Sequence, residues 1–244
     1  MMEWRKITRA AIAVVLVLSV LMCVTSCGLL PISTGETTVT LLVRGNLDAL
    51  YLGEFDDDYL KLIDSDEETE LQIYMEGIMM TAEYFAWYWG IIDTDADESL
   101  ADLDEKLQQD IIDLCVAISD QVKYEVQPAA KQKDGSYTVK VLITPVTIME
   151  EACEVYDKGS YRPLEDYLKK SQNADWDNMS SKEYWAMTNE YGQIIVDMVS
   201  GLLPELSYGE QKSMVIQVNE DEDGYLQMNG DDLAVFDSYV IPYP

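Results

Sequence analysis

The sequence predicts an α+β fold in which an antiparallel sheet of two hairpins packs against several helices. Apolar residues recur every three or four positions over long stretches, as on one face of a helix. Two shorter stretches instead alternate apolar and polar residues, as in half-buried strands. Because each hairpin has one apolar face and each helix one apolar stripe, the economical arrangement places the helices on one side of the sheet.

The first half of the domain is expected to be helical. A helix is predicted from Val39 to Tyr51, closed by Gly53, and a short acidic helix from Asp56 to Ile63. Ser65 begins the next helix, with Glu68 three residues on as in a capping box. The apolar face of this helix is expected to comprise Leu71, Tyr74, Ile78, Ala82, Phe85 and Trp89.

Another helix is expected after Ser99, because Asp102 suits a first helical turn. Its apolar residues at helical spacing are Leu103, Leu107, Ile111, Leu114, Ile118 and Val122. The pattern then changes to alternation at Tyr124 and Val126. A strong turn signal, Asp134-Gly135, precedes a second alternating run from Tyr137 to Thr144. This is the first predicted hairpin.

Helical spacing returns loosely from Met149 to Lys170, interrupted from Gly159 to Pro163. It is strong from Ser181 to Leu203, where Ser180 begins a capping box and Pro204 ends the helix. The predicted face of that helix comprises Tyr184, Met187, Tyr191, Ile194, Met198 and Leu202.

The second hairpin is predicted near the end of the chain. Residues alternate from Met214 to Val218, turn from Asn219 to Gly224 and return from Tyr225 to Met228. A last short helix is expected from Asp231 to Tyr239.

The N-terminus has the organisation of a lipoprotein signal peptide. Three basic residues within the first nine positions precede an uncharged run, Ala10 to Val24, of 15 residues. A bilayer-spanning helix needs about 20 apolar residues, whereas a signal-peptide core is shorter. The following Val24-Thr25-Ser26-Cys27 resembles a bacterial lipobox, in which the cysteine thiol accepts a diacylglyceryl group before cleavage. An ordinary secretory signal and a short membrane anchor are the alternatives.

These features predict three segments. Residues 1–26 form a lipoprotein signal peptide, residues 27–38 comprise the lipidated Cys27 and a flexible tether, and residues 39–244 form a single extracytoplasmic α+β domain. The expected location is therefore the extracytoplasmic face of the cell membrane, where the protein is held by its N-terminal lipid.

The composition excludes several classes of function. The chain has 16 Lys and Arg, 46 Asp and Glu and no His, which gives a formal net charge of −30. Without His, neither Ser-His-Asp nor Cys-His catalysis nor a His-ligated metal site is available. The negative charge argues against nucleic acid, because binding to phosphates requires a basic surface. Of the cysteines, Cys115 and Cys153 remain in the mature domain, either as one disulfide or as two buried thiols.

Several stretches resemble small extracytoplasmic lipoproteins of Gram-positive bacteria. The resemblance is carried by Leu42 to Leu62, by Ala82-Glu83-Tyr84-Phe85, by the hairpin with Asp134 to Val139 and by the terminal strand pair. These lipoproteins have cystatin-like domains of the broad nuclear-transport-factor-two-like group. The resemblance implies a curved sheet wrapped by helices, often with a concave pocket. It implies no catalytic residues, because most members have no known function.

The candidate ligand-binding residues are Tyr84, Trp87 and Tyr88, which lie one helical turn apart. Phe85 and Trp89 continue the apolar stripe of the same helix and are the expected core members. Rings with polar edges suit a small neutral, flat ligand such as a sugar. The alternative is that all five rings are structural.

No metal site or cofactor is expected. The loop that begins at Asn219 has alternate acids like an EF-hand, but its twelfth position is Gly230 instead of Glu. The loop that begins at Asp93 has Glu98 at the sixth position, where an EF-hand needs Gly. Both are therefore interpreted as solvated acidic loops.

The sequence thus predicts a lipid-anchored extracytoplasmic protein with a non-catalytic ligand- or protein-binding role. Two alternatives stay open: an enzyme with an Asp/Tyr proton-transfer pocket, and a structural or sensory accessory that binds another envelope protein through its acidic face. No single Asp is distinguished by the sequence. A desolvated Asp beside a Tyr in an apolar cavity would favour the enzyme.

Overall fold

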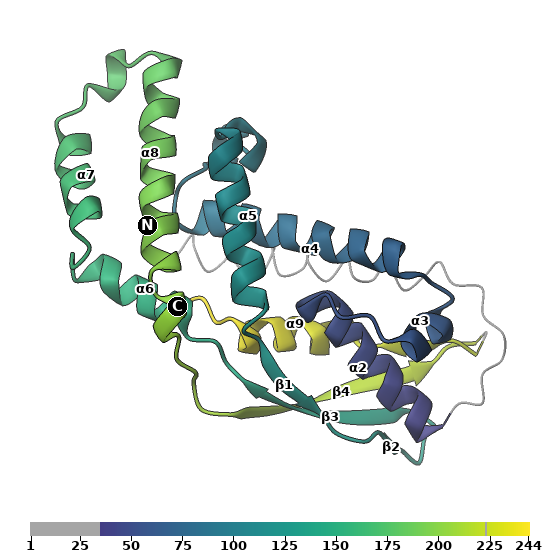
Figure 1. The fold of residues 1–244 in the computed structure, drawn as a ribbon. Helices are drawn as coiled ribbons and strands as arrows, with labels where there is room; N and C mark the ends of the chain where they lie inside the picture. Colours follow the sequence, from purple (N-terminus) through teal and green to yellow (C-terminus); the bar gives the residue numbers. More distant parts are fainter. Residues whose placement is uncertain (1–34, 223) are drawn as a thin grey trace. The chain divides into compact units, whose positions relative to one another are not determined.

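The computed structural model describes residues 35–222 and 224–244, which form two compact units (Figure 1). The sheet unit comprises 35–77, Val122–Pro145, 208–222 and 224–242. The helical unit comprises Ile78–Gln121, Val146–Ser207 and Tyr243–Pro244. Because the chain passes between the units repeatedly, neither is a continuous stretch of sequence, and the single domain over residues 39–244 stays a prediction. The predicted signal peptide and Cys27 lie outside the described residues.

The sheet confirms the predicted α+β fold, with both expected hairpins in one antiparallel sheet. Among the described residues the strand order is β1-β3-β4-β5, and β2 pairs with β3 beside β1. The hairpins join where β3 pairs with β4. The strands are β1 (Lys123–Val126), β2 (Ala130–Lys131), β3 (Tyr137–Thr144), β4 (Lys212–Glu220) and β5 (Leu226–Met228).

One face of the sheet is buried. Along β3, every second residue from Tyr137 to Ile143 is at most 1% exposed. Their partners across the ladder include Ile216 and Val218 of β4, which are fully buried. Helices α2 (Glu36–Leu52) and α9 (Gly230–Val240) pack on β3, and Figure 1 shows them on the same side of the sheet.

The start of α2 corrects the predicted tether. The helix begins at Glu36, so the last three residues expected in the tether, 36–38, are helical. Extended Gly35 lies at the N-cap, and Val39 is already fully buried. Because Val39 is packed in the core, the turn that precedes it is held in the helix. The helix therefore begins three residues before the first apolar residue of the stripe. Gly53 closes the helix in the left-handed region, as predicted.

The short helix α3 (Asp57–Ile63) and the long helix α4 (Glu67–Tyr88) follow. The predicted capping box of Ser65 and Glu68 is wrong. Asp66 instead accepts the backbone N–H of Thr69 at 2.8 Å. A carboxylate at this position satisfies an unpaired donor of the first turn, while the Ser65 hydroxyl donates to Glu70.

The predicted apolar face of α4 is confirmed except at its first residue. Leu71 is 47% exposed, whereas the other members are buried. Trp89 lies one residue beyond the end of the helix. Leu71 therefore belongs to a different face of α4.

The helical unit contains the second half of α4 and four further α-helices: α5 (Glu105–Ser119), α6 (Ile148–Asp157), α7 (Arg162–Gln172) and α8 (Ser181–Ser200). The break predicted between Gly159 and Pro163 separates α6 from α7. The helical unit also contains four short 3₁₀ turns: Thr94–Ala96, Leu100–Asp102, Trp176–Asn178 and Leu203–Glu205. Figure 1 shows α7 running beside α8, which also contacts α5 and α6.

The start of α8 confirms the capping box of Ser180 and Glu183. Its buried stripe is wider than predicted and includes Gly192, Ile195, Val196 and Val199. Tyr184, Tyr191, Ile194 and Leu202, which the spacing also placed on the buried face, are only half-buried. The stripe differs because α8 packs against several helices, and one contact face cannot describe that environment.

Cys115 and Cys153 of the helical unit are thiols and are not joined in a disulfide. Cys115 is buried, and burial raises the pKa of its thiol to about 12. It is therefore a small apolar core residue. Within residues 35–222 and 224–244, no helix combines the length and the apolar character needed to cross a membrane.

We expect Gly45→Ala to destabilise the sheet unit by about 1–3 kcal/mol. A Cβ at Gly45 in α2 would lie 2.2 Å from Cγ of Tyr59, whose ring is 2% exposed and packed against the helix. Gly77→Ala in α4 is the matched control, because its Cβ would meet nothing within 4 Å. The control should be neutral or stabilise by up to about 1 kcal/mol through helix propensity. Equal urea midpoints for the two variants would contradict the close packing of α2 on α3.

Candidate functional site

The three predicted ligand-binding residues lie together at the end of α4, in the helical unit. The ring centroid of Tyr84 is 5.5 Å from that of Trp87 and 6.3 Å from that of Tyr88. All three side chains are half-buried. Phe85 and Trp89 are buried, so the division into core rings and outer rings follows the helical periodicity.

A fourth ring, Tyr243, completes this aromatic cluster. It makes edge-to-face contacts with Tyr84 at 4.9 Å and with Tyr88 at 4.8 Å between centroids. Burial raises the pKa of the Tyr243 hydroxyl well above its ordinary value, so it stays protonated. The sequence gives no signal for Tyr243, because its place beside α4 depends on a contact between positions more than 150 residues apart.

The polar edge of Tyr88 is already engaged. Its hydroxyl lies 3.2 Å from Sγ of Cys153 and donates to the backbone carbonyl of Pro244 at 3.3 Å. Tyr84 and Tyr88 thus have structural contacts on their rings. The half-buried ring of Trp87 contacts Tyr84. It is less involved in packing than the rings of Tyr84 and Tyr88, which also contact Tyr243. A ligand at this surface would therefore rely most on Trp87.

The two acidic loops hold their carboxylates in local hydrogen bonds. Asp93 accepts the backbone N–H of Asp95 at 3.0 Å, and Glu98 accepts the backbone N–H of Asp93 at 2.9 Å. Glu98 also accepts the hydroxyl of Tyr184 on α8 at 2.8 Å. At the second hairpin, Asp221 accepts the backbone N–H of Tyr225 at 2.9 Å. These contacts shape the turns. Among the described residues no group of three or more Cys, Asp or Glu is arranged to hold a metal ion.

A shallow depression of about 400 Å³ lies between the end of α7 and the start of α8. Its polar groups serve the local fold. Asn178 donates to Asp175 at 2.9 Å, and Glu183 accepts the backbone N–H of Ser180. The lining residues are Ala174, Asp175, Asn178, Met179, Glu183, Ala186 and Met187.

The sheet unit contains a second cluster, built from two Tyr–Asp pairs around Phe236. Tyr51, near the end of α2, donates to the carboxylate of Asp237 on α9. Tyr124 of β1 donates to Asp48 of α2 at 2.7 Å. The ring of Phe236 lies between the tyrosines, at 4.8 Å from Tyr51 and 5.4 Å from Tyr124.

The local fold explains how these groups meet. Asn229 caps α9 by accepting the backbone N–H groups of Asp231 and Asp232. Asp232 in turn accepts the N–H of Gln217 in β4 at 2.8 Å, which fixes α9 on the sheet. The sequence places Tyr51 on the apolar stripe of α2 but gives no signal for Asp237, because acids are common throughout the chain.

Burial dominates the electrostatics of this cluster. It raises the pKa of the Asp237 carboxyl to about 6, although the hydrogen bond from Tyr51 lowers it. Burial also raises the pKa of Asp48, against the hydrogen bond from Tyr124. The pKa values of both tyrosines are raised, chiefly by burial, so they donate hydrogen bonds as neutral phenols. The carboxyl of Asp237 therefore keeps its proton to a higher pH than an exposed aspartate does.

The comparisons with known proteins concern the fold. No family model and no curated protein matches the sequence. Among solved structures, the crystal structure of the candidate lipoprotein YcdA from Bacillus subtilis subsp. subtilis strain 168 is similar, with a TM-score of 0.52 and 13% sequence identity. The likeness covers 84% of this chain and 56% of YcdA, so the chain spans little more than half the length of that protein. At this identity the similarity concerns the fold alone.

Proposed function

We propose that this protein is an extracytoplasmic lipoprotein, held at the cell membrane by a lipid on Cys27, with a non-catalytic binding role. The observation that carries the binding role is the aromatic cluster of Tyr84, Trp87, Tyr88 and Tyr243, which gathers half-buried rings on one surface of the helical unit. The lipobox at Val24 to Cys27 supports the anchor. The fold similarity to a candidate lipoprotein supports the lipoprotein part of the proposal.

The cystatin-like class is part of the proposal. A sheet with one buried face covered by α2 and α9 is the arrangement that this class implies. The ligand of the aromatic cluster is proposed to be small, neutral and flat, such as a sugar. Without its first 27 residues the chain has 13 basic and 45 acidic residues, and 13 − 45 = −32. A charge of this size disfavours anionic ligands.

A second candidate function, an enzyme with an Asp/Tyr proton-transfer pocket, is favoured by one observation. Asp237 is desolvated, has a pKa of about 6 and accepts a hydrogen bond from Tyr51. A group with this pKa can both release and accept a proton near neutral pH. The binding role ranks first because Asp237 and Asp48 are each held by a tyrosine within the packing of the sheet unit.

Cys27→Ser should abolish lipid attachment and shift the protein from the detergent phase to an uncleaved or mislocalised precursor. The thiol is the group that receives the lipid, and two or more acyl chains are needed for stable anchoring. Phase partitioning and intact mass of the expressed full chain measure this. Cys23→Ser is the matched control and should be processed normally. A processed Cys27→Ser protein that still partitions into detergent would rule out the lipobox.

Trp87→Ala and Tyr88→Ala separate binding from packing. Tyr88→Ala should destabilise by about 3–5 kcal/mol if its contacts with Tyr243 and Cys153 are structural. Trp87→Ala should lower the stability clearly less, and it should remove any small molecule that co-purifies with the membrane-extracted wild type. Melting temperature and mass spectrometry of the bound fraction are the two measurements. A loss as large for Trp87 as for Tyr88, with the bound fraction unchanged, would assign Trp87 to packing.

Asp237→Asn should remove the loss of folding stability that ionisation of this carboxyl causes as the pH rises. The folded-state pKa of about 6 lies above that of an unfolded aspartate, so the folded protein binds the proton more tightly. Stability from this group is therefore greatest at low pH and falls as the pH rises from about 4 to 6. At pH 8 the Asn variant should be more stable than wild type by on the order of 1–3 kcal/mol, provided that it keeps the hydrogen bond from Tyr51.

Exposed Asp120→Asn is the control for the general repulsion among acids. Melting temperatures from pH 4 to pH 8 give the comparison for both variants. If Asp237→Asn and Asp120→Asn follow wild type in parallel, Asp237 is not desolvated, and the enzyme hypothesis loses its basis.

A further inference from the structure

The outer face of α4 carries an exposed apolar stripe that the aromatic cluster does not include. Leu71, Met75 and Met79 are 47%, 37% and 45% exposed. They follow one another at intervals of four residues and so form one stripe along the helix. Large apolar side chains that line up on a surface mark interaction sites more often than scattered ones do. Methionines in particular adapt their shape to a partner.

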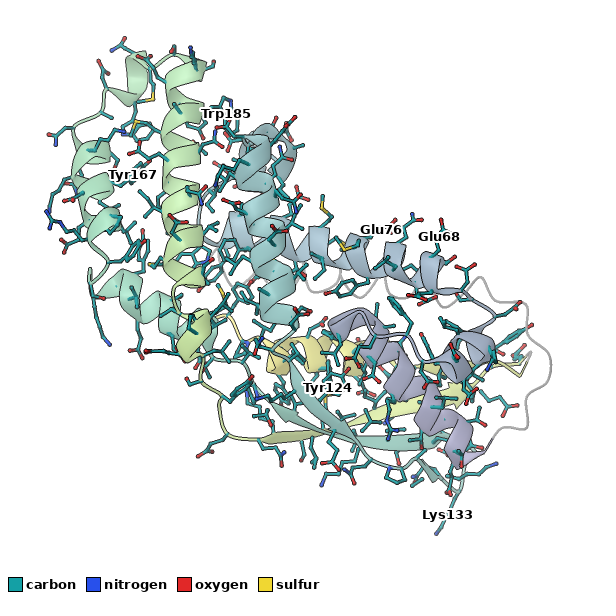
Figure 2. All side chains as sticks on the ribbon, in the orientation of Figure 1. Glu68, Glu76, Tyr124, Lys133, Tyr167 and Trp185 are labelled. Carbon is teal, nitrogen blue, oxygen red and sulfur yellow. The ribbon has the colours of Figure 1, made fainter. Side chains whose placement is uncertain are left out.

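Acidic side chains flank this stripe. Glu67, Glu68, Glu76 and Glu83 are exposed, and α4 contains no Lys or Arg. Figure 2 shows Glu68 and Glu76 projecting from α4 on the side away from α2. The neutral side-chain amide of Gln72 donates one hydrogen bond to Glu76, at 3.0 Å. The charges beside the stripe are thus left without a cation on their own helix.

Three other helices pair some of their acids with lysines of the same helix. Lys106 pairs with Asp110 on α5, and Lys158 pairs with Glu154 on α6. On α7, Lys169 lies within 3.8 Å of both Glu165 and Asp166. Among the ion pairs formed by described residues, none involves α4. The helix that exposes an apolar stripe is therefore also one that leaves its acids uncompensated.

We propose that the stripe of Leu71, Met75 and Met79 docks a basic amphipathic helix of a partner protein. The apolar face of such a helix would cover the stripe, and its Lys and Arg side chains would pair with Glu68 and Glu76. This is the general mode in which an amphipathic helix lies along an apolar surface. The docking surface is separate from the aromatic cluster, so the proposal does not depend on the ligand proposed for that cluster.

The negative charge beside the stripe favours a basic helix over a second copy of the chain and over an anionic membrane. A second copy of the chain would bring a second acidic rim against the first, and like charges at an interface cost several kcal/mol. An anionic membrane surface attracts basic segments and would repel the four glutamates. For a cationic amphipathic helix, both the apolar contact and the attraction to the glutamates favour binding.

The test uses an 18-residue peptide of leucine and lysine with helical apolar spacing, labelled for fluorescence anisotropy, and the detergent-extracted full chain. We expect saturable binding that weakens as salt increases. Leu71→Gln with Met75→Gln should weaken it at least about tenfold. Glu68→Gln with Glu76→Gln should weaken it and flatten its dependence on salt. The matched controls are Val215→Gln, at a residue that is 46% exposed on β4, and Glu210→Gln with Glu220→Gln.

Three outcomes would overturn the proposal. Equal binding of a scrambled peptide of the same composition would show a general attraction to the acidic protein. Equal losses of peptide affinity in the α4 and control variants would show that the stripe is not part of the binding surface. Dimerisation that Leu71→Gln with Met75→Gln abolishes would assign the stripe to a second copy. Peptide-dependent protection of Met75 from peroxide oxidation, measured by mass spectrometry on wild type, locates the site without any variant.

Discussion

The fold of the sheet unit depends on the burial of one face of β3. This strand pairs on both edges, with β1 and β2 on one side and β4 on the other. Its residues Tyr137, Val139, Val141 and Ile143 must be covered, because a two-sided sheet exposing them would leave a large apolar surface in water. Helices α2 and α9 provide that cover. The same contact brings Tyr51 and Asp237 together, so the Tyr–Asp cluster is a consequence of covering this face.

Most elements could be predicted because their signals are local. The turn at Asp134-Gly135, where Gly135 has a φ of +98°, and the capping box of Ser180 and Glu183 each depend on residues a few positions apart. The error at Ser65 has the same origin. Asp66 competes for the same cap position, and a carboxylate is the stronger acceptor. The exposure of Leu71 could not be predicted, because helical spacing gives the period of an apolar stripe but not its edges.

The candidate sites also differ in whether their residues meet through local geometry or through long-range contacts. Helical geometry alone brings Tyr84, Trp87 and Tyr88 together, and the structure places them in one cluster. Tyr243 and Asp237 depend on contacts between positions more than 150 residues apart, and nothing near them in the sequence indicates those contacts. Desolvation distinguishes Asp237 from the other acids, and desolvation is a property of the packed structure.

The net charge of −30 therefore does not itself indicate a function; the surroundings of each carboxylate do. Asp56, Asp66 and Asp93 accept backbone N–H groups at the starts of helices and turns, where a negative charge is stabilised. Acids on α5, α6 and α7 pair with lysines one turn away. Neither group has reason to attract a partner. Two further settings differ from these: acids desolvated beside a tyrosine, and acids that border an exposed apolar stripe. At Asp237, burial of the carboxylate costs free energy that a proton would recover. Along α4 the glutamates are exposed, and a basic partner would offer them ion pairs. Among the carboxylates, Asp237 and the glutamates of α4 are therefore the ones whose surroundings most favour a proton or a cation.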